Sequence, residues 1–466
     1  MTEKRKRKLA MPDTLIIVAL VVLLVAILSW IIPSGTYDYQ EMNINGRIRN
    51  VAIDGTYHTI DKSEVTTTGF LGFFSVLYRG CVEAADVIFM ILCCCGTFGV
   101  VVKTGAFHAG IGTILKKLKG KEILLVPIIM LIFGLGGSVF GMASEFYGFY
   151  PLIVGLGVAL GYDAMFGFAI IAVGEFVGFM GATLNPYSVG IAQTISGVEL
   201  YSGTGYRTIC FVIFMVISII YVMMYGRKIK KNPGASVVFG EKNIHAFDRD
   251  ELNEYSFTLK DGLVLLDVLV VLVVLMFGLI KWGWDFPQLC GLFLLMSMIA
   301  AAICKWSPNK WCSEFIDSAK TAMWGCILTG IAKAITVVMQ DAQIMDTVIY
   351  GLSNVLKNAP HAVSAQVMLV VQTLINFFIP SATGQASATM PIMAQLADII
   401  GVSRQTAVLA FQFGDGLSNI FWPTADIVII CGLGGISLQK WYKWFTPLFL
   451  ILFATQAILL GIATGI

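Results

Sequence analysis

Charged residues are scarce in this chain of 466 residues. Asp, Glu, Lys and Arg together make up 13% of it, hydrophobic residues make up 57%, and the mean hydropathy is +0.81. Because soluble domains carry about 25% charged residues, this composition excludes an ordinary soluble domain and indicates a membrane protein. The net charge of only +2 also argues against a nucleic acid as partner.

Histidine is equally scarce, and the cysteines lack the spacing of metal ligands. The four histidines are scattered, and the run Cys93-Cys94-Cys95 lies inside an apolar segment. No disulfide framework is visible, and no His-Glu-x-x-His motif is present. We therefore predict no metal, no organic cofactor and no catalytic residue. If an ion is coupled to the activity, we expect a proton more readily than sodium.

Two rival classes lack their motifs as well. Gly414-Asp415 is similar to the second motif of intramembrane aspartyl proteases, but that motif requires a glycine where this chain has Gln412. No repeated selectivity-filter motif or charged ring indicates a channel. An intramembrane enzyme and a channel remain remote alternatives.

Long apolar runs, in contrast, are abundant. A spanning helix needs about 20 mostly apolar residues. The segments that meet this rule are 14–32, 80–102, 164–186, 206–226, 261–281, 286–304, 316–340, 404–424 and 443–463. Basic clusters, beginning with residues 4–8, all fall on one side of this topology. The positive-inside rule therefore places the N-terminus in the cytoplasm, in the cytoplasmic (inner) membrane.

Two further apolar stretches, 124–160 and 362–401, are each interrupted half-way by small polar residues. The interruptions, at 137–144 and 380–387, resemble one another, and each stretch could form two full crossings or one re-entrant hairpin. We favour hairpins, since irregular backbone at membrane depth is tolerated where it lines a cavity. A Gly-acid pair and a proline-bearing break then follow in 164–186 and again in 404–424.

This repetition predicts an all-α polytopic fold with inverted halves, typical of secondary transporters. We expect about nine spanning helices, two re-entrant hairpins and two broken helices. The predicted order is a basic cytoplasmic N-terminus (1–13), a first half (14–226), a cytoplasmic linker (227–260) and a second half (261–466). Residues 107–118 and 344–356 are expected to form amphipathic helices in the membrane interface.

The ends of broken helices leave backbone N–H and C=O groups free to bind a carboxylate or a cation. We therefore expect substrate at the two tips and the two breaks. The predicted substrate-binding residues are Gly141, Ser144, Glu145, Asn185, Gly384, Ser387, Asn419 and Thr424.

Ionisable residues inside a membrane are costly and usually functional. Glu175 and Asp415 follow glycines at equivalent positions of the two broken helices, and Lys333 lies deep in 316–340. We predict that these three residues pair charges or carry the coupling ion. A purely structural ion pair is the alternative for them.

The chain resembles the YfcC family. The resemblance rests on residues 10–14, the Trp-Ile-Ile-Pro-Ser-Gly-Thr-Tyr stretch at 30–37, the Gly-rich segment 134–145 and Gly-Asp-Gly-Leu-Ser-Asn at 414–419, and it covers essentially the whole chain. That family groups with basic amino-acid antiporters and anaerobic C4-dicarboxylate carriers. The resemblance implies a scaffold domain, a mobile transport domain, an elevator-like step and a homodimer.

One departure from related carriers bears on the ligand. Such carriers have Ser-Asn-Thr at both tips, where sodium and a carboxylate bind, whereas this chain has Ala-Ser-Glu at 143–145 and Ala-Ser-Ala at 386–388. An acid at one tip favours a zwitterionic or cationic amino acid. The prediction is a basic amino-acid transporter working by exchange or proton coupling, with a proton- or sodium-coupled C4-dicarboxylate carrier as the alternative.

Overall fold

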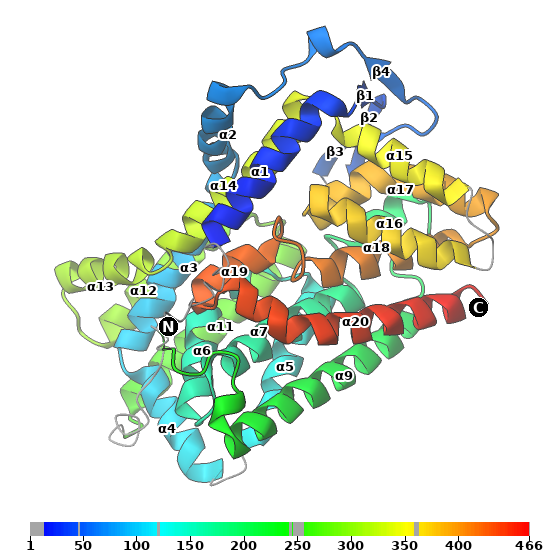
Figure 1. Ribbon diagram of the computed structural model, residues 1–466. Coiled ribbons are helices and arrows are strands. Elements are labelled where there is room, and N and C mark those ends of the chain that lie inside the picture. Colours follow the sequence, from blue (N-terminus) through cyan, green and yellow to red (C-terminus); the bar gives the residue numbers. More distant parts are fainter. Residues whose placement is uncertain are drawn as a thin grey trace, which may run out of the picture.

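The computed structural model describes residues 14–44, 47–118, 122–241, 245, 256–357 and 363–465, and within them the fold is almost entirely helical (Figure 1). Seven of the described helices are long and apolar enough to span a membrane. They are α3 (Ala85–Lys103), α7 (Ala164–Gly181), α9 (Thr204–Lys231), α11 (Leu259–Lys281), α12 (Phe286–Ile303), α14 (Met323–Asp341) and α20 (Leu438–Ala463). The predicted N-terminal segment 1–13 lies outside the described residues.

Helices occupy all nine predicted spans, but two of them are not counted among these seven. Helix α1 (Thr14–Ile31) is apolar, but its apolar stretch Leu15–Ile31 is slightly shorter than a spanning helix. Helix α18 (Arg404–Ser418) ends six residues before the predicted limit, because the chain turns at Asn419. The chain is interrupted between α18 and the next helix, which starts at Asp426, within the segment for which a broken helix was predicted.

Two predicted spans, 80–102 and 316–340, each include parts of two consecutive helices. Helix α2 (Phe70–Glu83) leads directly into α3, and α13 (Pro308–Lys320) leads into α14. The pairs lie against each other, α2 on α14 and α3 on α13. At one crossing the approach is very close, since a Cβ on Gly80 would lie 2.3 Å from the Gly330 carbonyl oxygen. The length rule missed α2 and α13 because charged residues interrupt both.

Each interrupted stretch forms two helices. The first contains α5 (Leu125–Leu135) and α6 (Phe149–Ala159), joined by a π-helical turn and an irregular segment. At 1.5 Å per residue each helix is about 16 Å long, roughly half of a 30 Å hydrocarbon core. The second contains α16 (Ser364–Phe378) and α17 (Ala382–Ile399).

The break in the second stretch is shorter than predicted. It spans only Ile379, Pro380 and Ser381, because the Ser381 side chain caps α17 by accepting a hydrogen bond from the Gly384 N–H. Gly384 and Ser387 therefore lie in the first turns of a helix and not in an irregular tip.

The halves are matched around two buried helices, α7 and α18. Helix α7 packs against both α5 and α6, and α18 packs against both α16 and α17. The glycine before each acid marks the closest approach: a Cβ on Gly174 would lie 2.9 Å from Met130 Cα, and one on Gly414 would lie 2.8 Å from Gln372 Cβ. The two Gly-acid pairs therefore hold equivalent positions against the first arm of their own stretch.

All 18 residues of α7 are buried, which makes it the centre of the core. Asp163 begins the helix by accepting a hydrogen bond from the Phe166 N–H at 2.7 Å. The helix ends where Ala182 adopts a left-handed backbone conformation. Helix α7 also touches α18, since a Cβ on Gly416 would lie 2.4 Å from Met180 Cα.

A small β element lies beside α15 (Met345–Lys357), at the end of α1 (Figure 1). The strands are β1 (Ser34–Thr36), β2 (Tyr39–Ile44), β3 (Arg47–Ala52) and β4 (His58–Ile60), paired β1 with β4 and β2 with β3, both antiparallel. The carboxylate of Asp346 attaches this element to α15 by accepting hydrogen bonds from the Tyr37 N–H and the Tyr39 hydroxyl.

The remaining helices complete the chain. Helices at α4 (Ala106–Leu118) and α15 agree with the two predicted amphipathic segments, and α9 runs five residues into the predicted linker. Short helices α8 (Val189–Ile195) and α19 (Asp426–Gly434) follow the breaks after α7 and α18.

Candidate functional site

A cavity of about 530 Å³ lies where the two interrupted stretches approach α14 and the start of α19. Small and hydroxylated residues form much of its wall, together with two acids, Glu83 and Asp426, and one lysine on α14. The lining residues that carry the argument are Ser144, Tyr147, Thr329, Lys333, Thr336, Ser381, Gly384, Thr424 and Asp426. Residues of both halves line it.

Four of the predicted site residues line this cavity: Ser144, Lys333, Gly384 and Thr424. The other seven do not. Gly141, Glu145, Asn185, Glu175, Ser387, Asn419 and Asp415 lie behind the wall, in the tips, the breaks or the core. The sequence did not separate residues that face this cavity from those that lie behind its wall.

The first tip and the first break are bound tightly to each other. Ser138 accepts a hydrogen bond from the Thr183 N–H at 3.1 Å, and its carbonyl accepts one from the Leu184 N–H at 3.2 Å. Gly141 has a φ of 68°, and a Cβ there would lie 2.3 Å from Asn185 Oδ1. Only glycine fits at this contact.

Asn185 shapes the break that follows α7. Its Oδ1 accepts hydrogen bonds from the Tyr187 N–H at 2.9 Å and the Ser188 N–H at 3.2 Å, as an Asx turn does. Its Nδ2 is buried and has no partner within the described residues. The second tip reaches this break, since the Thr383 hydroxyl donates to the Tyr187 carbonyl at 2.8 Å.

The second break is held by one buried amide. Asn376 Nδ2 donates to the Asp415 carbonyl at 2.9 Å, to Ser418 Oγ at 2.7 Å and to Asn419 Oδ1 at 2.9 Å. Asn419 therefore supports the end of α18 and does not face the cavity. The sequence analysis missed Asn376, one of three amide side chains in α16, with Gln366 and Gln372.

Glu175 and Asp415 are sealed in the core, each with 0% exposure. Glu175 Oε2 accepts a hydrogen bond from the Tyr150 hydroxyl at 2.8 Å, while its Oε1 has no partner among the described residues. Asp415 lies beside Asn419, and neither of its oxygens has a partner with hydrogen-bond geometry within the described chain. A carboxyl buried without a cation is far cheaper to hold protonated than ionised.

Lys333 does not neutralise the sealed acids. Within the described residues it forms no ion pair with Glu145, Glu175 or Asp415, and it lies half-buried in the cavity wall. Glu145 instead folds back on its own tip, where Oε2 accepts a hydrogen bond from the Ala143 N–H at 3.0 Å. The charge pairing expected for Lys333 is absent from this conformation.

Asp426 lines the cavity, as does Glu83 at the end of α2. Asp426 is the first residue of α19, and its Oδ1 accepts a hydrogen bond from the buried Tyr147 hydroxyl at 2.7 Å. The positive end of the α19 dipole lies at this position and favours a negative charge. The cavity thus presents carboxylates from α2 and α19 and an ammonium from α14.

The polar face of α14 was also missed. Thr329, Lys333, Thr336 and Gln340 all line the cavity, and their spacing of four, three and four residues places them on one face of the helix. A polar stripe at helical spacing inside an apolar span was the signal that could have identified them.

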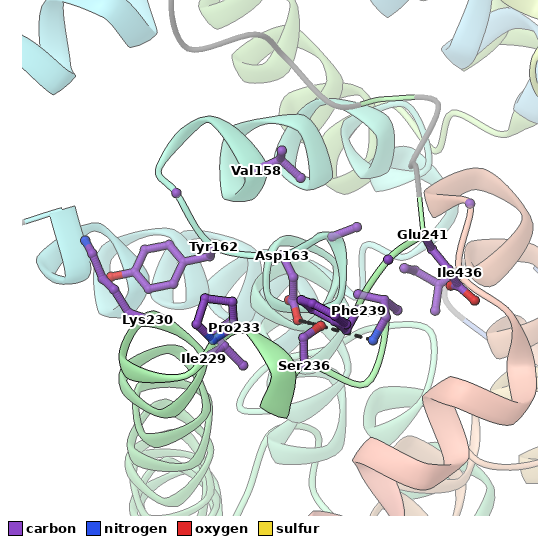
Figure 2. Close-up of a pocket in the computed structure, with 15 residues that line it drawn as sticks. Val158, Tyr162, Asp163, Ile229, Lys230, Pro233, Ser236, Phe239, Glu241 and Ile436 are labelled. Atoms are coloured by element: carbon purple, nitrogen blue, oxygen red, sulfur yellow. Dashed lines mark hydrogen bonds between the residues drawn. The ribbon is translucent and has the colours of Figure 1, made fainter.

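A second cavity, of about 520 Å³, lies at the turn between α6 and α7 and beside residues 229–241 (Figure 2). Its polar groups already have structural partners. Asp163 accepts hydrogen bonds from the Tyr225 hydroxyl at 2.5 Å and the Ser236 hydroxyl at 2.6 Å in addition to capping α7, and Glu241 forms an ion pair with Lys440 at 2.6 Å. We therefore place the candidate site in the cavity between the two halves.

Comparison with known proteins agrees with a transporter. Residues 11–465 match the profile of the C4-dicarboxylate anaerobic carrier family, DcuC. The chain is 32% identical to the "putative basic amino acid antiporter YfcC" of Escherichia coli, over 98% of this chain and 96% of that protein. It is 27% identical to an uncharacterized protein of Haemophilus influenzae, over 99% of each.

Two solved transporters give structural matches at low similarity. The Alcanivorax borkumensis YdaH transporter covers 97% of this chain, and 98% of its own, with a TM-score of 0.43 and 16% identity. The match to Neisseria gonorrhoeae MtrF, described with a class of antimetabolite efflux pumps, covers 98% of this chain and 96% of that protein, with a TM-score of 0.43 and 14% identity.

Proposed function

The chain belongs to the C4-dicarboxylate anaerobic carrier family, and on that premise we propose that it moves amino acids across the cytoplasmic membrane as a secondary active transporter. The proposed substrate is a basic amino acid such as arginine or ornithine, and transport proceeds by exchange or with protons. The cavity between the two halves is the proposed substrate site.

The pair of opposite charges in the cavity carries this proposal. An amino acid presents a carboxylate to Lys333 and a positive end to Asp426, and the hydroxyl groups of Ser144, Ser381 and Thr424 offer hydrogen bonds between them. Charge-assisted hydrogen bonds are about twice as strong as neutral ones. The name of the Escherichia coli relative points to the same substrate class.

A C4-dicarboxylate is the second candidate, favoured by the family's description. Lys333 and the wall hydroxyls suit a carboxylate, but an ionised Asp426 repels a second one. A dicarboxylate therefore requires Asp426 to carry a proton, which would couple its transport to protons.

For the mechanism we propose re-entrant hairpins, inverted halves and an elevator-type movement. The half-length helices α5 and α6 are too short to cross a membrane singly, and the matched packing around α7 and α18 supports inverted repeats. Helices α2, α3, α13 and α14 form the proposed scaffold. Cross-linking α14 to α19 should then stop exchange, and undiminished exchange would contradict the movement.

The proposed surroundings are a lipid bilayer and a second copy of the chain, with the N-terminus in the cytoplasm. Large apolar side chains on α11 are exposed, among them Leu263, Leu266, Leu269 and Phe277, as expected of a face that contacts lipid. The mass of the detergent-purified protein measured by light scattering tests the proposed homodimer.

Counterflow in proteoliposomes tests the substrate. Vesicles loaded with unlabelled arginine, ornithine or succinate receive a trace of labelled substrate outside. We expect internal arginine or ornithine to drive accumulation, and accumulation with succinate alone would transfer the chain to the dicarboxylate class. Absence of counterflow with all three would contradict both candidates.

Two variants separate the candidates further. Asp426→Asn should lower exchange of a basic amino acid at least about tenfold, because a hydrogen bond to a charged group contributes about 1.5–3 kcal/mol. Lys333→Gln should lower exchange of either substrate class. The matched control is Asp398→Asn, an exposed acid paired with Arg404 away from the cavity. An Asp426→Asn variant with normal arginine exchange would exclude Asp426 from binding.

A further inference from the structure

Arg207 lies near the start of α9, beside the break that follows α7, and only 1% of it is exposed. No carboxylate forms an ion pair with it among the residues that the structure describes. A buried guanidinium without a counter-ion is costly unless other groups compensate its charge. The surroundings of Arg207 show how that compensation is made.

Backbone carbonyls surround the guanidinium. Nε donates to the Ala182 carbonyl at 3.0 Å, Nη1 to the Ser202 carbonyl at 2.7 Å, and Nη2 to the Thr183 carbonyl at 3.2 Å. Nη2 also donates to Thr204 Oγ1 at 3.1 Å. The ligands of the charge are thus the carbonyl dipoles of the break itself, where the negative end of the α7 dipole lies.

This arrangement is the one in which transporters bind a coupling cation. In discontinuous membrane helices, unwound carbonyls and half-helix C-terminal ends coordinate sodium. Here the chain fills that position with its own side chain. The neighbouring Phe179 carbonyl is likewise occupied, by Gln412 Nε2 at 2.8 Å.

The equivalent end of α18 is also closed by a side chain. Asn376 Nδ2 donates to the Asp415 carbonyl, as described above, and Ser418 Oγ donates to the Gly414 carbonyl at 2.5 Å. At both helix ends, side chains of the described residues therefore occupy carbonyls that could otherwise bind an alkali cation.

We propose that Arg207 is a fixed internal cation that takes the place of a coupling sodium ion at the first break. The inference rests on the proposed transport function and specifies its coupling. A positive charge that is covalently part of the moving element is not released on either side of the membrane. Substrate exchange then proceeds without sodium, and any ion coupling falls to protons.

The first test compares sodium with choline at equal ionic strength. Wild-type counterflow should have the same rate in both media, and the melting temperature should be the same in both. Sodium-dependent counterflow, or stabilisation of the wild-type protein by sodium alone, would overturn the inference. If no substrate shows counterflow, the proposed function fails, and the melting temperatures still decide the question of sodium.

The second test removes the guanidinium. Arg207→Ala should lose counterflow at least about tenfold, and millimolar guanidinium should restore part of it. A cavity of about 270 Å³ beside Arg207 gives a small cation access to the vacated site. Full exchange by Arg207→Ala without any added cation would also overturn the inference.

The control is Arg404→Ala. Arg404 also donates to a backbone carbonyl, that of Ser196 at 2.9 Å, but it is exposed and paired with Asp398. Its variant should not respond to guanidinium. If Arg207→Ala cannot be purified, the comparison of sodium with choline in the wild-type protein decides the outcome.

Discussion

Replacing Gly141 with alanine should disrupt the first tip. The residue has a φ of 68°, and the left-handed conformation costs a residue with a side chain about 1–2 kcal/mol. The new methyl group would also lie 2.3 Å from Asn185 Oδ1. Asn185 must then move, and its hydrogen bonds to the Tyr187 and Ser188 N–H groups are lost.

The magnitude follows from these two terms. Leaving buried donors unpaired costs about 1–3 kcal/mol, so with the backbone term the total is about 2–5 kcal/mol. We expect a lower melting temperature in detergent and loss of counterflow, because the tip and the break no longer bind each other. Fluorescence-detected size exclusion after heating measures the first, and the proteoliposome assay measures the second.

Two other glycines separate the contributions. Gly55 has a φ of 78°, and a Cβ added there would meet nothing within 4 Å, so Gly55→Ala reports the backbone term alone. Gly205 has neither a positive φ nor a close neighbour, so Gly205→Ala reports the added methyl group alone. If Gly141→Ala is as stable and active as Gly205→Ala, the contact with Asn185 does not hold the tip and the reasoning is refuted.

Two further predictions concern tyrosine hydroxyls. Tyr150→Phe leaves both oxygens of Glu175 without a partner among the described residues and should lower the free energy of unfolding by about 1–3 kcal/mol. The control is Tyr442→Phe, which loses only a hydrogen bond to a backbone carbonyl and should lower the melting temperature less. An equal decrease in both variants would contradict a special role for Glu175. Burial, and then the neighbouring Asp346 carboxylate, raise the pKa of Tyr39. A raised pKa means that the neutral phenol stabilises the fold fully below its unfolded pKa of about 10 and that this stabilisation is lost as the pH rises through the folded value. The pH-dependent tyrosinate absorbance of the wild-type protein and Tyr39→Phe should therefore differ only above about pH 10, and ionisation of Tyr39 below that pH would be the contrary result.

Glu175 and Asp415 show that an acid in a broken helix does not necessarily face a cavity. Sequence analysis grouped Glu175 and Asp415 with the cavity, since both follow glycines in broken helices. In the fold those glycines admit the backbones of α5 and α16, and the acids next to them are enclosed. The acids that reach the cavity are Asp426, which follows the second break, and Glu83 at the end of α2.

Much of the architecture was determined by the sequence alone. Low charge and long apolar runs predicted a polytopic helical protein, and the family resemblance is confirmed over the whole chain. The interruptions in 124–160 and 362–401 and the breaks after α7 and α18 also lie where small residues and prolines predicted them. These features are local, because backbone conformation at glycine and proline depends on the residue itself.

Only the tertiary structure decided which side chains face the cavity. Lys333 and Asp426 come from helices that are distant in the sequence, and their common cavity depends on how α14 and α19 pack. Nothing in the sequence singled out Arg207, yet packing buries it against the carbonyls that follow another helix. Such assignments require the directions of side chains in three dimensions, which neither hydropathy nor residue spacing contains.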